Sequence, residues 1–260
     1  MIYLKTDEEI ELMRESNLLL GQTLGELAKW VAPGISTLKL DSIAEEYIRD
    51  NGGIPSCLGY SGYPNSICAS VNEQVVHGIP SGYVLKDGDI ISIDLCVLKN
   101  GFHGDSTYTF CVGEVSYDVR RLLKTTKEAL YLGIEQAVDG KRVGDISNAI
   151  QSYCEKKGYS VVREMCGHGI GKHMHEEPEV PNYGRRGCGP ILRSGMVIAI
   201  EPMINMGSRN IVIERDGWTT RTRDRKPSAH YELSVAVREG KADILSTFKY
   251  VEEVLGDRFI

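Results

Sequence analysis

The chain has 260 residues and a formal net charge of −6, with 42% hydrophobic and 25% charged residues, which is typical of a globular protein with a substantial core. No long basic run is present, so we expect no direct contact with nucleic acid. No apolar run approaches the roughly 20 residues of a membrane span, and the acidic N-terminal segment is unlike a signal peptide. The scattered cysteines form no CxxC pair, which favours reduced thiols in a cytoplasmic protein.

A long helix and a shorter one are expected in the first 50 residues. Thr6 and Glu9 have the spacing of a capping box, and apolar residues then recur at helical spacing up to Leu27. Pro33-Gly34 ends this helix, and residues 40–49 form the next one.

A β-hairpin is expected next. Residues 90–94 form a strongly apolar strand that ends on Asp94, and Asn100-Gly101 suits a type I′ turn. If these two residues are the whole loop, Asp94 opposes Thr107, and Asp105 lies diagonally on the same sheet face, about 7–8 Å away between Cα atoms. A three-residue loop would instead put the two acids on opposite faces.

The second half shows the same order of elements. Helices are expected at 119–137 and 143–157, with a break at Asp139-Gly140, and strands follow. Helices followed by strands in each half, without strict alternation, predict an α+β fold with a mainly antiparallel sheet. Two related halves also predict a site at their junction, where ligands commonly bind.

The strands carry the clearest sign of an internal repeat. Residues 85–94 read LKDGDIISID and residues 192–201 read LRSGMVIAIE, 107 positions apart. Asp105 and Glu232 each begin an alternating strand that reaches a glycine eight residues later. We therefore expect a single domain, residues 1–260, built from a repeat of approximately 6–113 and 114–250.

Four carboxylates converge at the predicted junction. The repeat makes Glu201 and Glu232 the counterparts of Asp94 and Asp105. So many acids beside apolar strands repel one another and are costly to desolvate, which divalent cations relieve. His168, between two glycines, can add an imidazole, and this oxygen-rich set suits Mn, Fe or Co and can hold Zn. Taken singly, each acid is also compatible with a solvated turn or an ion pair.

Several motifs resemble the type I methionine aminopeptidases, and their order and spacing cover essentially the whole chain. They are NEQVVHGIP (72–80), ISIDLCV (91–97), GDSTYTF (104–110), GHGIGKHMHEEPEVPNYG (167–184), IAIEPMIN (198–205) and AHYELSV (229–235). The resemblance implies the pita-bread (creatinase-like) fold. It also implies a metalloaminopeptidase that removes the N-terminal methionine when residue two is small.

The resemblance implies a role for each polar residue of these motifs. Asp105 and Glu232 bridge two metal ions, Asp94 completes one site, and His168 and Glu201 complete the other. A water bridging the ions attacks the first peptide bond, and Glu201 is the general base.

The resemblance also implies substrate contacts. His77 contacts the substrate near its N-terminal end, and His175 hydrogen-bonds the scissile peptide and stabilises the tetrahedral intermediate. A soft, apolar methionine pocket is formed by Cys57, Tyr60, Tyr63, Cys68, Met174 and Trp218. Packing residues of a core are the alternative reading of this last group.

Departures from the family pattern surround the site. Ser61 and Leu233 stand where the family often has His, and His230 replaces a common Gln. These changes leave the ligand set intact and bear on metal preference, since neighbours of a ligand tune its affinity. His230 shares a strand face with Glu232 and can itself approach a metal.

Two other interpretations remain open on the sequence. A prolidase or Xaa-Pro aminopeptidase shares the acids, although such enzymes carry an additional N-terminal domain. An inactive binding module on the same scaffold is disfavoured, because such modules tend to lose metal ligands and all five candidate ligands are present in this sequence. For the aminopeptidase we expect N-terminal Met peptides and nascent chains as substrates, proximity to the ribosome, no membrane contact, a monomeric state and a cytoplasmic location.

Overall fold

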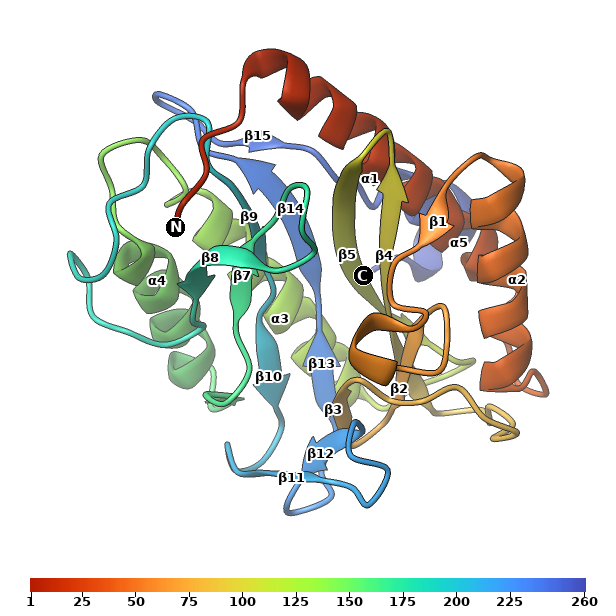
Figure 1. Cartoon of the computed structure of the whole chain (residues 1–260). Helices are drawn as coiled ribbons and strands as arrows, with labels where there is room; N and C mark the ends of the chain where they lie inside the picture. Colours follow the sequence, from red (N-terminus) through yellow and green to blue (C-terminus); the bar gives the residue numbers. More distant parts are fainter.

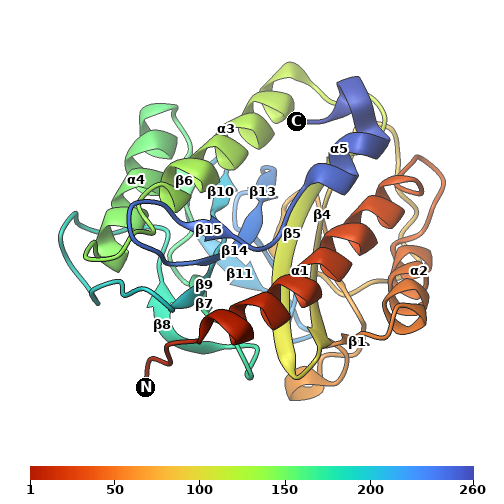
Figure 2. The same cartoon turned by 90° about the horizontal axis from the view of Figure 1, so that it is seen from above.

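A computed structural model describes residues 1–260 as an α+β fold in which helices cover one side of a central sheet (Figures 1 and 2). The helices are α1 (Asp7–Ala28), α2 (Thr37–Asp50), α3 (Tyr117–Ile134), α4 (Val143–Lys156) and α5 (Lys249–Leu255). None of them combines the length and the apolar character that a membrane span requires.

The central sheet has nine strands, and all of its pairings are antiparallel, as predicted. Its main path, in spatial order, is β1 (Ile54–Pro55), β4 (Ile90–Lys99), β5 (Phe102–Cys111), β14 (Glu232–Ala236), β9 (Val197–Ile200), β7 (Gly167–Gly169) and β8 (Glu176–Val180). Two strands lie off this path: β2 (Cys68–Val71) pairs with β4, and β15 (Asp243–Ile244) pairs with β14.

Two small sheets extend one end of the molecule (Figure 1). One contains β13 (Ser228–His230), β10 (Met203–Asn205) and β6 (Ser160–Val161). The other contains β11 (Ile211–Ile213), β12 (Thr220–Thr222) and β3 (Gln74–Val76). Because β13 leads into β14, with Tyr231 between them, this end is joined directly to the central sheet.

The ends of the helices follow local capping chemistry. The predicted capping box of α1 is present, since Glu9 N donates to Thr6 Oγ1 at 3.3 Å and Thr6 N donates to Glu9 Oε2 at 3.1 Å. α2 begins three residues before the predicted start at Leu40, because the Ser36 hydroxyl accepts a hydrogen bond from Lys39 N at 3.2 Å. The leucines of α1 at positions 20, 24 and 27 are completely buried in the main core.

The β4–β5 hairpin has the predicted register. Asn100 and Gly101 have φ of 54° and 81°, as a type I′ turn requires. Lys99 pairs with Phe102, so the loop contains two residues. Asp94 therefore pairs with Thr107 and Cys96 with Asp105, which puts both acids on one face of the sheet.

Matching positions in the two halves make matching bonds. Gly34 N donates to Leu85 O at 2.8 Å, and Gly140 N donates to Leu192 O at 3.0 Å. In the centre of the sheet, β5 of the first half pairs with β14 of the second. These contacts support the internal repeat, which stays a prediction.

Candidate functional site

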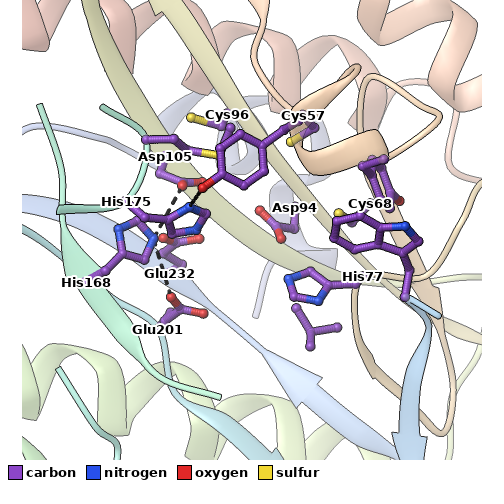
Figure 3. Close-up of a pocket in the computed structure, with 15 residues that line it drawn as sticks. Cys57, Cys68, His77, Asp94, Cys96, Asp105, His168, His175, Glu201 and Glu232 are labelled. Atoms are coloured by element: carbon purple, nitrogen blue, oxygen red, sulfur yellow. Dashed lines mark hydrogen bonds and ion pairs between the residues drawn. The ribbon is translucent and has the colours of Figure 1, made fainter. Parts of the chain in front are cut away.

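A cavity of about 160 Å³ brings together all of the site residues predicted from the sequence (Figure 3). Its lining consists of Cys57, Tyr60, Tyr63, Cys68, Val76, His77, Asp94, Cys96, Asp105, His168, Met174, His175, Glu201, Trp218 and Glu232. Val76 and Cys96 are additions that the sequence did not single out. Cys96 follows from the hairpin register, because it pairs with Asp105 and shares a strand face with Asp94.

Neighbouring strands each contribute one of the five candidate ligands. Asp94 lies on β4, Asp105 on β5, Glu232 at the start of β14, Glu201 directly after β9, and His168 on β7. These strands are consecutive in the central sheet. The side chains therefore meet although the residues are far apart in the sequence, as the labelled sticks in Figure 3 show.

The carboxylates of this group are buried without matching positive charge. Asp105, Glu201 and Glu232 are at most 9% exposed, and no lysine or arginine pairs with them. Burial, with added repulsion between the acids, raises the pKa of all three well above the usual carboxyl range. Burial also raises the pKa of Asp94.

The donor set fits a metal centre. Thr107 donates to Glu232 Oε2 at 2.8 Å, but Glu232 Oε1 has no hydrogen-bond partner. Ligand atoms of Asp105, His168 and Glu232 lie within 4.8 Å of one another. A cation at this position would satisfy the orphaned oxygen and offset the repulsion between carboxylates.

His168 is oriented as a ligand. Its Nδ1 lies 2.9 Å from Gly169 O, which makes Nδ1–H the donor and leaves the Nε2 lone pair free. Nε2 is 3.8 Å from Asp105 Oδ2 and also 3.8 Å from Glu201 Oε1. Burial lowers the pKa of this imidazole to about 3, so it is neutral at physiological pH.

The two histidines outside the ligand set line the same cavity. The His77 backbone has φ of 59°, and the ring packs edge-on against Trp218 with centroids 6.1 Å apart. Burial, with repulsion from His230, lowers the pKa of His77 to about 4. The His175 ring contacts the His168 ring at 4.3 Å between centroids, and burial lowers the pKa of His175 as well.

Aromatic and sulfur side chains form the remaining wall. The single hydroxyl hydrogen of Tyr63 is shared between Ile67 O at 3.1 Å and Gly78 O at 3.0 Å, which fixes its ring against Trp218 at 5.2 Å between centroids. Cys57, Cys68 and Met174 complete a mainly apolar surface. The predicted pocket residues are therefore adjacent to the predicted ligands.

The three residues that depart from the family pattern, His230, Leu233 and Ser61, lie in different surroundings. His230 is buried with its Nε2 3.4 Å from Glu201 Oε2, and neither ring nitrogen has a hydrogen-bond partner. Leu233 belongs to the main apolar core because consecutive residues of a strand face opposite sides. Ser61 lies in a turn with φ of 47°.

The family model of metallopeptidase family M24 matches residues 11–239 of this chain. Methionine aminopeptidase from Clostridium perfringens (strain 13 / Type A) is 53% identical over 249 residues, which cover 96% of this chain and 100% of the relative. Methionine aminopeptidase 1 of Bacillus subtilis (strain 168) is 51% identical over 95% of this chain and 99% of its own. The chain belongs to the methionine aminopeptidases of this family.

Solved structures agree with this assignment. Methionine aminopeptidase from Rickettsia prowazekii has a TM-score of 0.94 at 40% identity, covering 95% of this chain and 100% of its own. The prolidase from Pyrococcus furiosus, at 22% identity and a TM-score of 0.76, shares the fold alone and covers 94% of this chain and 65% of its own. The fold of this methionine aminopeptidase is therefore the expected pita-bread fold.

Proposed function

We propose that this methionine aminopeptidase hydrolyses the first peptide bond of peptides and nascent chains that begin with Met and have a small second residue. The observation that carries the proposal is the group of four carboxylates, three of them buried, and His168, which adjoins a pocket walled by aromatic and sulfur side chains. Family membership supports a metal-dependent peptidase reaction.

Two divalent ions are the proposed cofactors, with Mn, Fe, Co and Zn as the candidates. Asp105 and Glu232 would bridge them, Asp94 would complete one site, and His168 and Glu201 would complete the other. Divalent metals supply Lewis acidity, which activates water and polarises a peptide carbonyl. The orphaned Glu232 Oε1 and the free Nε2 lone pair of His168 support a cation held by these residues.

The protein side chains then have distinct tasks. Glu201 accepts a proton from the attacking water and passes it to the leaving amine. His175 donates a hydrogen bond to the oxygen of the scissile carbonyl as negative charge develops there. His77 contacts the substrate near its N-terminal end, and its low pKa makes it a neutral hydrogen-bonding group.

The methionine side chain occupies the space beside Cys57, Tyr63, Cys68, Met174 and Trp218. A thioether is polarizable, and it makes favourable contacts with aromatic rings and other sulfur atoms. Tyr60 adjoins the same space and is 40% exposed.

We also propose that residues 1–260 form one catalytic domain, that the protein is a monomer in the cytoplasm, and that it works close to the ribosome. The cytoplasmic location and the proximity to the ribosome follow from the substrate, because nascent chains carry the initiator methionine. Sedimentation analysis checks the oligomeric state directly.

Chelator-stripped protein tests the proposed activity. We expect no methionine release from Met-Ala-Ser until Mn, Fe, Co or Zn is added, because the carboxylates alone cannot activate water. An Ala-Pro peptide is the matched control and should stay intact. Folded protein that binds metal and cleaves neither peptide would contradict an aminopeptidase, and cleavage of Ala-Pro alone would favour a prolidase.

A further inference from the structure

The hydroxyl of Tyr60 contacts the ring of His175 directly. Tyr60 Oη lies 2.7 Å from His175 Nδ1, and the two rings are tilted at 5.2 Å between centroids. The residues are 115 positions apart in the sequence, so the fold alone creates this pair. A pocket wall for a thioether side chain does not require such a hydrogen bond.

The turn that carries Tyr60 is tightly constrained. Gly59, Ser61 and Gly62 all have positive φ, at 82°, 47° and 86°. Gly59 N donates to Tyr63 O, and Tyr63 N donates to Tyr60 O, both at 2.8 Å. Because Tyr63 is 3% exposed and bonded to two backbone carbonyls, it anchors the turn. A left-handed serine is a costly conformation, and it is retained at functional sites where the surroundings enforce it.

The hydrogen bond has a consequence for the protonation of His175. A neutral phenol has one hydrogen to donate, and the tautomer of the ring decides whether Tyr60 Oη or His175 Nδ1 is the donor of this bond. When Tyr60 donates to Nδ1, a neutral imidazole must carry its own hydrogen on Nε2, at the opposite edge of the ring. His175 lines the cavity beside the candidate ligands, so an Nε2–H there is a donor for a substrate oxygen.

We propose that Tyr60 is a positioning residue for catalysis: its hydroxyl holds His175 in the Nε2–H tautomer, ready to donate to the scissile carbonyl. This inference rests on the proposed function, because it deepens the role of His175 in that reaction. The Tyr60 ring can still adjoin the methionine side chain. The hydroxyl then orients His175 for catalysis, while the ring contributes to binding of the methionine side chain.

The Tyr60→Phe variant separates these two tasks, because phenylalanine keeps the ring and removes the hydroxyl. We expect kcat for Met-Ala-Ser to fall by about 10- to 100-fold with little change in KM, which is less than the roughly 100- to 1,000-fold loss on removal of an oxyanion donor, because the His175 ring itself is retained. A residue that acts solely as a pocket wall would change KM instead. Circular dichroism of the variant checks that the fold is retained.

The tautomer itself is measured by long-range ¹H–¹⁵N correlation on protein labelled with ¹⁵N-histidine, both metal-free and loaded with diamagnetic zinc. The His175→Gln variant assigns the resonances. In the unmodified protein we expect an unprotonated Nδ1 and a protonated Nε2. In Tyr60→Phe we expect a mixture of tautomers. Tyr83→Phe is the matched control: it loses a tyrosine hydroxyl that bonds to Asp89 outside the cavity, so the tautomer should stay unchanged.

Two results would overturn the inference: a protonated Nδ1 in the unmodified protein, or a Tyr60→Phe variant with the original tautomer and kcat. Failure of the proposed function looks different, because the unmodified protein would then release no methionine from Met-Ala-Ser with any metal. The tautomer measurement does not depend on turnover, so the two failures are distinguishable.

Discussion

At the scale of single residues, Thr107 is the side chain that supports a candidate ligand most directly. Its hydroxyl donates to Glu232 Oε2 at 2.8 Å, while Glu232 Oε1 has no hydrogen-bond partner. This bond favours the ionised carboxylate and fixes its orientation, and burial acts against that ionisation. Thr107 is therefore predicted to assist metal binding at Glu232 without being a ligand.

The Thr107→Val variant is expected to bind Mn about 10-fold more weakly, because outer partners of metal ligands typically contribute 10- to 100-fold in affinity. Isothermal titration calorimetry of the chelator-stripped protein measures this change. Thr107→Ser retains the hydroxyl and should bind as tightly as the unmodified protein. Equal weakening by Val and Ser would show that packing, and not the hydrogen bond, is responsible.

At the scale of elements, the contact between α1 and α5 depends on glycines inside α1. A Cβ atom added at Gly25 would lie 2.6 Å from Tyr250 Cβ, and one added at Gly21 would lie 2.9 Å from Thr247 O. Glycine lowers helix stability by up to about 1 kcal/mol relative to alanine. Close packing against the segment around α5 therefore requires glycine at these two positions, although helix propensity favours alanine.

The Gly25→Ala variant is accordingly expected to lower the free energy of unfolding by about 1–3 kcal/mol, the usual cost of overpacking. Propensity alone predicts the opposite sign. Urea titration followed by circular dichroism measures the change. Glu46→Ala, at an exposed position in α2, is the matched control and should shift stability by about 0.5 kcal/mol or less. A stabilised Gly25→Ala protein would show that α5 moves freely relative to α1.

At the scale of the whole molecule, the buried carboxylates of the site lower the free energy of unfolding of the metal-free protein when they are ionised. The pKa values of Asp105, Glu201 and Glu232 are raised on folding. Each acid therefore favours the folded state fully below its unfolded pKa, and this stability is lost as the pH rises through its folded pKa. A divalent metal binds the ionised carboxylates of the folded state, and this binding offsets the loss of stability with rising pH.

We expect the melting temperature of the metal-free protein, measured in the presence of a chelator, to fall as the pH is raised from 5 to 8. At pH 7.5, saturating Mn should raise it by roughly 5–10 °C, as follows from about 2–3 kcal/mol of binding linkage in a domain of this size. Differential scanning calorimetry with and without chelator checks both trends. The Glu232→Gln variant should show a weaker pH dependence in chelator, and an unchanged slope would assign the effect to other groups.

The sequence by itself determined the features that depend on neighbouring residues. The capping box joins residues three apart, and the Asn100-Gly101 turn fixes the register that puts Asp94 and Asp105 on one face. Family motifs then identified a set of site residues that share one cavity, although their roles remain proposals. Such inferences succeed because helix caps and two-residue turns have few local solutions.

The tertiary structure decided the contacts between residues that are remote in the sequence. Thr107 meets Glu232 because β5 pairs with β14, and Tyr60 meets His175 because a turn after β1 lies beside the segment between β7 and β8. Cys96 and Val76 joined the cavity for the same reason. The sequence pattern shows which face of a strand a residue occupies, but pairing across more than a hundred residues depends on packing of the whole core, which no local signal encodes.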